Sequence, residues 1–164
     1  MNDMEYIQSK VTNEEKLKYT LSYYRFKGQK IVFTNGCFDL LHRGHVEYLL
    51  KASGLGDVLI IGLNSDNSVQ KLKGPGRPLQ DEYTRALILA SFSFVDHVIL
   101  FDEDTPLHLI EFLQPDVLVK GGDYMPEEIV GSNVVTAIGG TVQIIDYIPD
   151  FSTTKLIDKL KSAE

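Results

Sequence analysis

The chain has 164 residues, 43% of them hydrophobic and 24% charged, which suits one domain with a sizeable core and excludes two ordinary domains. Its formal net charge of −7 argues against nucleic-acid binding, because no basic excess is present to displace counterions from a phosphate backbone. The single cysteine, Cys37, excludes an internal disulfide and a multi-cysteine zinc site. The polar N-terminus and the short apolar runs predict neither a secretion signal nor a membrane span, so we expect a cytoplasmic protein with no membrane partner.

The first predicted element is a helix over residues 12–26, with Thr12 as its N-cap and Glu15 at the spacing of a capping box. We assign residues 1–29 to an N-terminal helical extension, which could pack at a homo-oligomer interface, and residues 30–164 to the main domain. Five continuous apolar runs in that domain predict buried strands, at 30–35, 56–64, 95–101, 116–123 and 140–148. Helical patterns separate or follow them, at 42–55, 65–73, 81–93, 104–113, 127–139 and 152–162.

This alternation of strands and helices predicts an α/β, Rossmann-like three-layer domain with a five-stranded parallel sheet. In such sheets, ligands bind beyond the carboxyl ends of the strands. The segments that directly follow the strands are therefore the candidates for the site.

The segment GCFDLLHRGH, residues 36–45, follows the first of the main domain's strands. Gly36 permits a tight turn, and Gly44 has no side chain to keep a phosphate from the backbone. His42 and His45 are three residues apart, so they share one side of a helix N-terminus that favours an anion. Imidazoles donate hydrogen bonds to phosphoryl oxygens and, when protonated, add positive charge. The alternative is that one histidine caps the helix and the other packs.

This segment resembles the signature of the HxGH nucleotidyltransferases of the cytidylyltransferase-like superfamily, and STTKLI, residues 152–157, resembles a second motif of that family. Its members share a Rossmann-like fold and transfer a nucleoside monophosphate from a nucleoside triphosphate to a phosphate-bearing acceptor, releasing pyrophosphate. The resemblance implies catalytic roles for six residues: His42, His45, Lys73, Ser152, Thr153 and Thr154. Read from the residues alone, 152–154 begin a helix and either hold phosphate oxygens or only cap that helix.

The Gly- and Pro-rich loop KGPGRP, residues 73–78, carries cationic side chains. The resemblance implies that Lys71 and Lys73 contact the acceptor phosphate and the triphosphate, although a solvated loop would have a similar sequence. It also places Arg85 near the phosphates; from the pattern alone, Arg85 would be a surface residue. The nucleotide-binding set implied by the resemblance is Gly36, Cys37, Phe38, Gly44, Arg85, Gly121, Gly122 and Asp123.

The sequence also offers candidate residues whose binding role has a structural alternative. Asp39 either faces the sugar or acceptor or fixes the turn, and Asp123 either contacts the ligand or is a simple turn residue. His108 lies in the first turn of a helix that Thr105 caps, where an acceptor phosphate could reach it. Cys37 is otherwise a small buried neighbour of the turn, and we assign His97 to a strand edge.

Several segments together are most similar to the D-glycero-β-D-manno-heptose 1-phosphate adenylyltransferases, which make ADP-heptose for the lipopolysaccharide core. They include LNSD, LKGPGRP, VDHVILFDEDTP, PDVLVKGGDY and EEIVGS. The chain has no room for a sugar kinase, so the resemblance implies a separate heptose kinase in the same pathway. The segment before STTK lacks the arginine that glycerol-phosphate relatives have there, which leaves one phosphate contact unassigned.

The implied reaction is in-line attack by a sugar phosphate oxygen on the α-phosphorus of ATP, with Mg²⁺ held mainly by the nucleotide and water, since no carboxylate cluster appears in the motifs. We therefore predict no metal-ligating residues. The alternatives are a CTP-dependent cytidylyltransferase for glycerol 3-phosphate or another polyol phosphate, and a non-catalytic nucleotide-binding module. A dinucleotide oxidoreductase and a P-loop NTPase are excluded, because neither GxGxxG nor GxxxxGK[ST] occurs.

Overall fold

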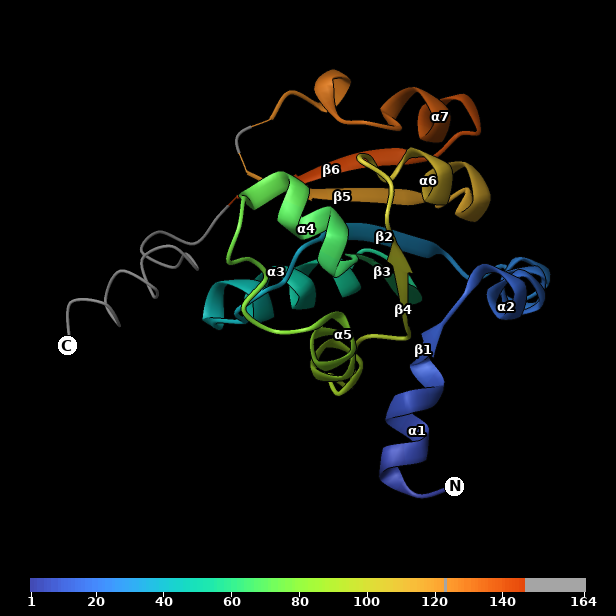
Figure 1. Cartoon of the computed structure of the whole chain (residues 1–164). Coiled ribbons are helices and arrows are strands. Elements are labelled where there is room, and N and C mark those ends of the chain that lie inside the picture. The colour runs from blue at the N-terminus through green and yellow to red at the C-terminus, as the bar shows by residue number, and fades with distance from the viewer. Residues whose placement is uncertain (123, 147–164) are drawn as a thin grey trace.

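The computed structural model describes residues 1–122 and 124–146. Its strands form one six-stranded sheet in the order β1-β4-β3-β2-β5-β6, and every neighbouring pair is parallel. The strand bounds are Val11–Thr12 for β1, Ile31–Gly36 for β2, Val58–Asn64 for β3, His97–Phe101 for β4, Val117–Gly121 for β5 and Thr141–Ile145 for β6. In Figure 1, β6, β5 and β2 follow one another down from the top of the view.

The helices are α1 (Asp3–Lys10), α2 (Glu14–Phe26), α3 (Arg43–Ser53), α4 (Asp66–Lys73), α5 (Glu82–Ala90), α6 (Leu107–Leu113) and α7 (Ser132–Ala137), with a 3₁₀ turn at Pro126–Glu128. The chain runs outward from β2 through β3 to β4 on one side, and through β5 to β6 on the other. The strand order therefore reverses between β2 and β5, and ligands of open α/β sheets bind in the crevice at such a point.

Aspartates at the amino ends of neighbouring strands fix the sheet register. The Asp57 carboxylate accepts a hydrogen bond from the Lys30 main-chain N–H, and the Asp116 carboxylate accepts one from the Ile31 N–H, both at 2.7 Å. Asp96 makes the same contact with the N–H of Leu59 on β3. Because each carboxylate binds a main-chain donor of the adjacent strand, the strands start in register and their carboxyl ends meet at one edge.

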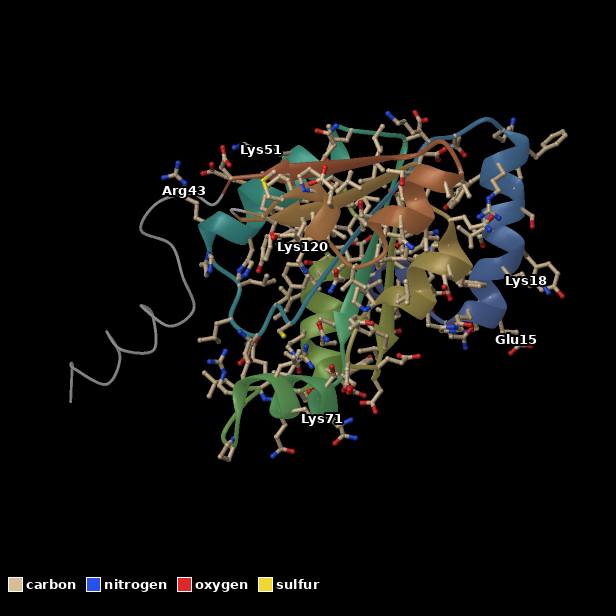
Figure 2. All side chains as sticks on the ribbon, turned by 90° about the horizontal axis from the view of Figure 1, so that it is seen from above. Glu15, Lys18, Arg43, Lys51, Lys71 and Lys120 are labelled. Carbon is tan, nitrogen blue, oxygen red and sulfur yellow. The ribbon has the colours of Figure 1, made fainter. Side chains whose placement is uncertain are left out.

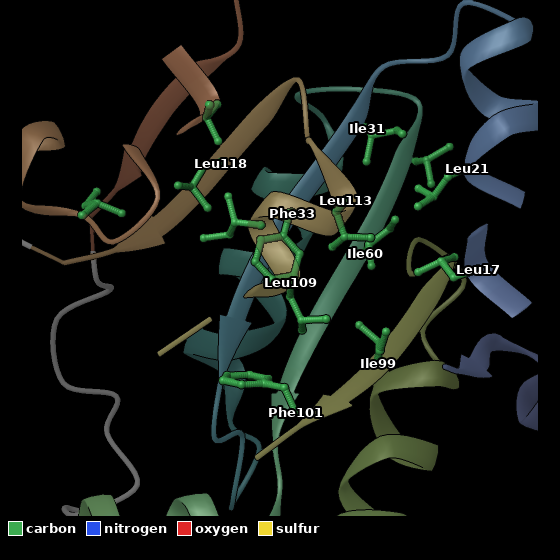
Figure 3. Close-up of a cluster of buried hydrophobic side chains, with 14 residues drawn as sticks. Leu17, Leu21, Ile31, Phe33, Ile60, Ile99, Phe101, Leu109, Leu113 and Leu118 are labelled. Carbon is green, nitrogen blue, oxygen red and sulfur yellow. The ribbon is translucent and has the colours of Figure 1, made fainter. Parts of the chain in front are cut away.

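Apolar side chains fill both faces of the sheet. On one face, α2, α6 and α7 cover Phe33, Ile60 and Leu118 (Figure 3). On the other face, α3 and α5 cover a second cluster around Leu59, Ile61 and Val119. The predicted three-layer, Rossmann-like class is therefore confirmed.

The predicted number of strands is wrong, because β1 adds a sixth strand that pairs with β4. β1 is only two residues long, too short to produce a sequence pattern. It includes Thr12, so the predicted cap is also displaced: Asn13 caps α2 and accepts a hydrogen bond from the Lys16 N–H. Leu17 and Leu21 of α2 are buried against the sheet, so α2 is part of the main core.

One predicted helix, 127–139, is divided. Gly131 has φ +83°, and a Cβ there would lie 2.5 Å from the Ile110 side chain, so the chain turns before α7 begins. The predicted helix at 152–162 lies outside the described residues. No helix in the described part of the chain is long and apolar enough to cross a bilayer.

Candidate active site

The two histidines of the HxGH segment lie at the start of α3, beyond the carboxyl end of the central strand β2. His42 is the N-cap residue of α3, and Gly44 and His45 lie in its first turn. The two imidazole rings stack with centroids 3.9 Å apart and an interplanar angle of 27°. The His42 main-chain N–H donates to Nδ1 of His45 at 3.4 Å, so Nε2 of His45 carries the proton in the neutral ring. The structure thus brings the predicted pair together.

The surroundings of both imidazoles favour the neutral ring. Burial, the neighbouring His42 and the charge of Lys73 lower the pKa of His45 to about 4. Burial also lowers the pKa of His42. A nearby anion would favour the protonated form of such a partly buried, stacked pair. This site can therefore gain positive charge when a polyphosphate arrives.

The loop between β2 and α3 has an unusual backbone. Phe38 is a buried, non-glycine residue with φ +44°, a left-handed conformation that costs energy for a bulky side chain. Its ring packs edge-on against His45 at 5.4 Å between centroids. A Cβ at Gly36 would lie 2.9 Å from the same ring, so a side chain there would force the Phe38 ring to move. The strained loop therefore fixes the orientation of His45.

Tyr48, one turn after His45, ties α3 to two strands. Its hydroxyl lies 2.6 Å from Oγ1 of Thr34 on β2 and donates to the Val119 carbonyl on β5 at 3.4 Å. Tyr48 is not among the predicted site residues, although its spacing of three from His45 puts it on the same side of the helix. Tyr48 holds the histidine helix against the strands where the sheet order reverses.

Asp39 anchors the loop after α4. Its buried carboxylate accepts hydrogen bonds from Nε of Arg77 at 2.6 Å and from the main-chain N–H groups of Leu79 and Gln80. Of the two predicted roles, the structure gives Asp39 that of fixing a turn; contact with the acceptor remains a prediction. The glycines of this loop have positive φ, at Gly74 and Gly76, whereas its second half is held by Asp39.

Arg85 is fully buried, not on the surface as its sequence pattern alone indicates. Its guanidinium donates to the carbonyls of Gln80, Cys37 and Asn64 at 2.6–3.0 Å and pairs with Asp66 at 2.8 Å. These partners belong to the loop before α5, the loop after β2, the end of β3 and the start of α4. Arg85 therefore holds four segments of the site together through four hydrogen bonds.

The two predicted lysines of α4 differ in their surroundings. Lys73 ends the helix; its charge adds to the effect of burial in lowering the pKa of His45 and opposes the rise that burial gives the pKa of Cys37. Lys71 is exposed and extends from the outer side of α4 in Figure 2. The structure thus places Lys73 within electrostatic reach of the histidines and leaves Lys71 toward solvent.

A pocket of about 280 Å³ opens beside Arg77, between α4 and the loop that follows it. Its lining is polar: Asp66, Asn67, Gln70, Arg77, Pro78 and Asp81. Carboxylate and amide groups of this kind suit the hydroxyls of a polyol better than a phosphate. Among the described residues, no three His, Cys, Asp or Glu side chains gather into a metal-binding cluster.

The remaining residues of the predicted nucleotide-binding set lie in the loop after β2 and at the end of β5, or outside the described residues. Gly121 ends β5, and the N–H of Gly122 donates to the Ile145 carbonyl at 3.1 Å. Cys37 is half-buried, and burial raises the pKa of its thiol. Asp123 and the segment Ser152, Thr153 and Thr154 lie outside the described residues, so their roles remain predictions.

Two further histidines lie away from the pair. His108 is exposed on α6 and contacts the Glu14 carboxylate at 2.9 Å; its contact with an acceptor remains a prediction. The predicted cap at Thr105 is wrong, because the helix begins after Pro106 without a side-chain cap. His97 is the first residue of β4, and its Nε2 lies 2.8 Å from the Tyr24 hydroxyl.

Comparison with known proteins identifies the family to which the chain belongs. The family model described as "Cytidylyltransferase-like" matches residues 33–159. A solved structure described as the lipopolysaccharide core biosynthesis protein from Thermoplasma volcanium is 27% identical, with a TM-score of 0.61. The match covers 74% of this chain and 98% of that one.

Curated relatives are more similar in sequence. The bifunctional protein HldE of Syntrophotalea carbinolica is 55% identical over 152 residues, which is 93% of this chain and 31% of that protein. The HldE proteins of Geobacter metallireducens and Campylobacter jejuni are 56% and 54% identical, each over 94% of this chain and 32% of their own length. The chain thus spans about a third of the length of these relatives.

The family predicted from the HxGH and STTK segments is confirmed by these matches, and the family model spans both motifs. The same residues that carry the resemblance, His42 and His45, lie where the parallel sheet has its binding crevice. The chain belongs to the cytidylyltransferase-like family and is a nucleotidyltransferase.

Proposed function

We propose that the protein transfers AMP from ATP to D-glycero-β-D-manno-heptose 1-phosphate, giving ADP-heptose and pyrophosphate for lipopolysaccharide core biosynthesis. The stacked His42 and His45 pair at the start of α3 is the observation that carries the transfer chemistry. The choice of heptose rests on the sequence segments named above, and the description of the Thermoplasma volcanium structure supports the pathway.

The reaction needs positioning and charge rather than a nucleophilic side chain. An ionised oxygen of the sugar phosphate attacks the α-phosphorus of ATP; a new P–O bond forms while the bond to the bridging oxygen breaks, and pyrophosphate leaves on the opposite side. The attacking oxygen already carries negative charge, so no general base is required. The N–H of His45 and the N-terminus of α3 stabilise the charge that develops on the phosphoryl oxygens.

Other residues keep this arrangement rigid. Lys73 adds positive charge next to His45, and residues 152–154 would bind further phosphate oxygens. Asp39 and Arg85 act as positioning residues, because both use their hydrogen-bonding groups on loops of the site. Rigid placement of the two substrates supplies a large share of the rate enhancement in such reactions.

We also propose that Mg²⁺ accompanies ATP. The ion would be held mainly by triphosphate oxygens and water. When bound, the ion would offset charge on the triphosphate. A separate kinase would supply the heptose 1-phosphate, a proposal that fits the longer, bifunctional relatives. A cytoplasmic location follows from these substrates.

Pyrophosphate release tests the proposal. Purified protein with Mg²⁺ is offered ATP or CTP, each with heptose 1-phosphate or glycerol 3-phosphate. Release with ATP and heptose 1-phosphate alone is the expected result. Release with CTP and glycerol 3-phosphate alone would replace the proposal by the cytidylyltransferase alternative, and nucleotide binding without release from any pair would favour a non-catalytic module.

A further inference from the structure

Lys120 is the one Lys, Arg, Asp or Glu residue in the six strands that the described residues form. Every neighbour of Lys120 in β5 is apolar or glycine, and the strand is covered on both faces. A charged side chain in such a strand costs free energy unless a partner compensates it. Its presence therefore calls for an explanation beyond packing.

The position of Lys120 is next to the binding crevice. It is the penultimate residue of β5, at the carboxyl end, and β5 lies beside β2 where the strand order reverses. The preceding residue, Val119, accepts the hydrogen bond from Tyr48 of the histidine helix. In Figure 2, Lys120 lies inside the outline of the molecule, whereas Lys51 and Lys71 lie at its periphery. Lys120 and His45 thus belong to two elements that Tyr48 joins.

The ammonium group has no hydrogen bond or ion pair with the described residues, although the side chain is half-buried. Burial lowers the pKa of Lys120, and the only described ionisable group that opposes this shift is the Cys37 thiol, which belongs to the loop that leads to the histidines. A half-buried cation that has no partner among residues 1–122 and 124–146, at the edge of a site for phosphates, is suited to bind an anionic ligand.

We propose that Lys120 is a further substrate-binding residue whose ammonium group binds a phosphate oxygen of one of the two substrates in the crevice between β2 and β5. This inference rests on the proposed function for the identity of the substrates. The phosphate belongs either to the triphosphate or to the sugar 1-phosphate, and the two sources share the chemistry of a phosphoryl oxygen.

The test compares Lys120→Met, which keeps the length and removes the charge, with Lys120→Arg, which keeps the charge. Calorimetric titrations use ATP and pyrophosphate as one arm and heptose 1-phosphate and inorganic phosphate as the other. Loss of one charge-assisted hydrogen bond should weaken binding in one arm by about tenfold to a hundredfold in the methionine variant. The arginine variant should retain most of the affinity, and Lys51→Met, on the exposed side of α3, should bind as the wild type does.

Thermal unfolding separates a binding role from a structural one. Removing a desolvated charge should leave the melting temperature of Lys120→Met equal to or above that of the wild type. Weaker binding with unchanged or higher stability supports the proposal, and the arm affected identifies the phosphate. Wild-type affinity in both arms, or a loss of binding that accompanies a clear fall in melting temperature, overturns it. Because binding is measured directly, a wild type that binds phosphates but releases no pyrophosphate would refute the proposed function and leave this test readable.

Discussion

The imidazole rings of His42 and His45 lie face to face, 3.9 Å apart, at the point where the central strand passes into α3. Two cationic rings would repel each other at this distance, and burial adds to the cost of charging either one. The pair therefore favours the neutral form without ligand, and negative charge from a bound ligand would favour protonation.

His45→Ala should lower kcat by roughly two to three orders of magnitude, the effect of losing one donor to transition-state charge. Circular dichroism should show an intact fold, because His45 is only partly buried at the surface of the crevice. Steady-state pyrophosphate release measures the effect. The matched control is His97→Gln, which changes a histidine at the opposite end of the sheet and should keep wild-type turnover; a His45→Ala enzyme with near-wild-type kcat would remove His45 from the mechanism.

Nucleotide binding should raise the pKa of His45 from its ligand-free value of about 4. The negative charge of the triphosphate favours the imidazolium ring, so the complex binds a proton that the free protein does not. The Cε1–H resonance of His45, followed by NMR from pH 4 to 8 with and without a non-hydrolysable ATP analogue, measures the shift. Identical titration curves in both samples would contradict this expectation.

Stability should fall as the pH drops from about 6.5 toward 4. The His45 ring titrates near 6.5 in the unfolded chain and near 4 in the folded protein, so the unfolded chain binds more protons in this window. The lowered pKa values of His42 and His97 act in the same direction. Urea unfolding at pH 7.5 and 5.0 measures the loss, and His45→Gln should reduce it. An equal pH dependence in the wild type and in that variant would rule out His45 as a source.

Arg85→Ala should destabilise the protein by roughly 3 kcal/mol, because it leaves buried carbonyls without donors and Asp66 without its partner. Arg85→Lys should recover little of this, since an ammonium group cannot reproduce the fork of the guanidinium. Urea denaturation measures both variants. The control, Arg43→Ala, removes an exposed arginine paired with Glu47 and should cost less than about 1 kcal/mol; an equally small loss for Arg85→Ala would show that its bonds are dispensable.

The sequence predicted the elements that repeat a clear pattern. The strands of the main domain lie in continuous apolar runs. Asp57, Asp96 and Asp116 precede three of these strands and set the strand register, a role that was not predicted. β1 was missed because two residues carry no periodicity and because its pairing with β4 depends on contacts distant in sequence. At Gly131, where the predicted helix is divided, a Cβ would meet Ile110, a contact across 21 residues of sequence that a local pattern does not reveal.

For the site, the HxGH segment predicted its own local geometry, because the histidines are neighbours on one helical turn. The burial of Arg85 could not be predicted in this way, because its helix pattern indicates an exposed side chain. The tertiary structure shows that it is buried and bonded to four segments of the chain. Lys120 was visible in the sequence as a lysine within the apolar run VLVKGG. Its proposed role in binding became clear only from the position of β5 beside β2.

The most direct test of the central claim is ³¹P NMR of the reaction of wild-type protein with ATP, Mg²⁺ and heptose 1-phosphate. AMP transfer predicts two coupled resonances of a sugar nucleotide diphosphate and one of pyrophosphate, appearing in equal molar amounts, with no ADP. The appearance of ADP with a newly phosphorylated sugar, or of ADP with orthophosphate, would mean transfer of the γ-phosphate or hydrolysis and would contradict the account.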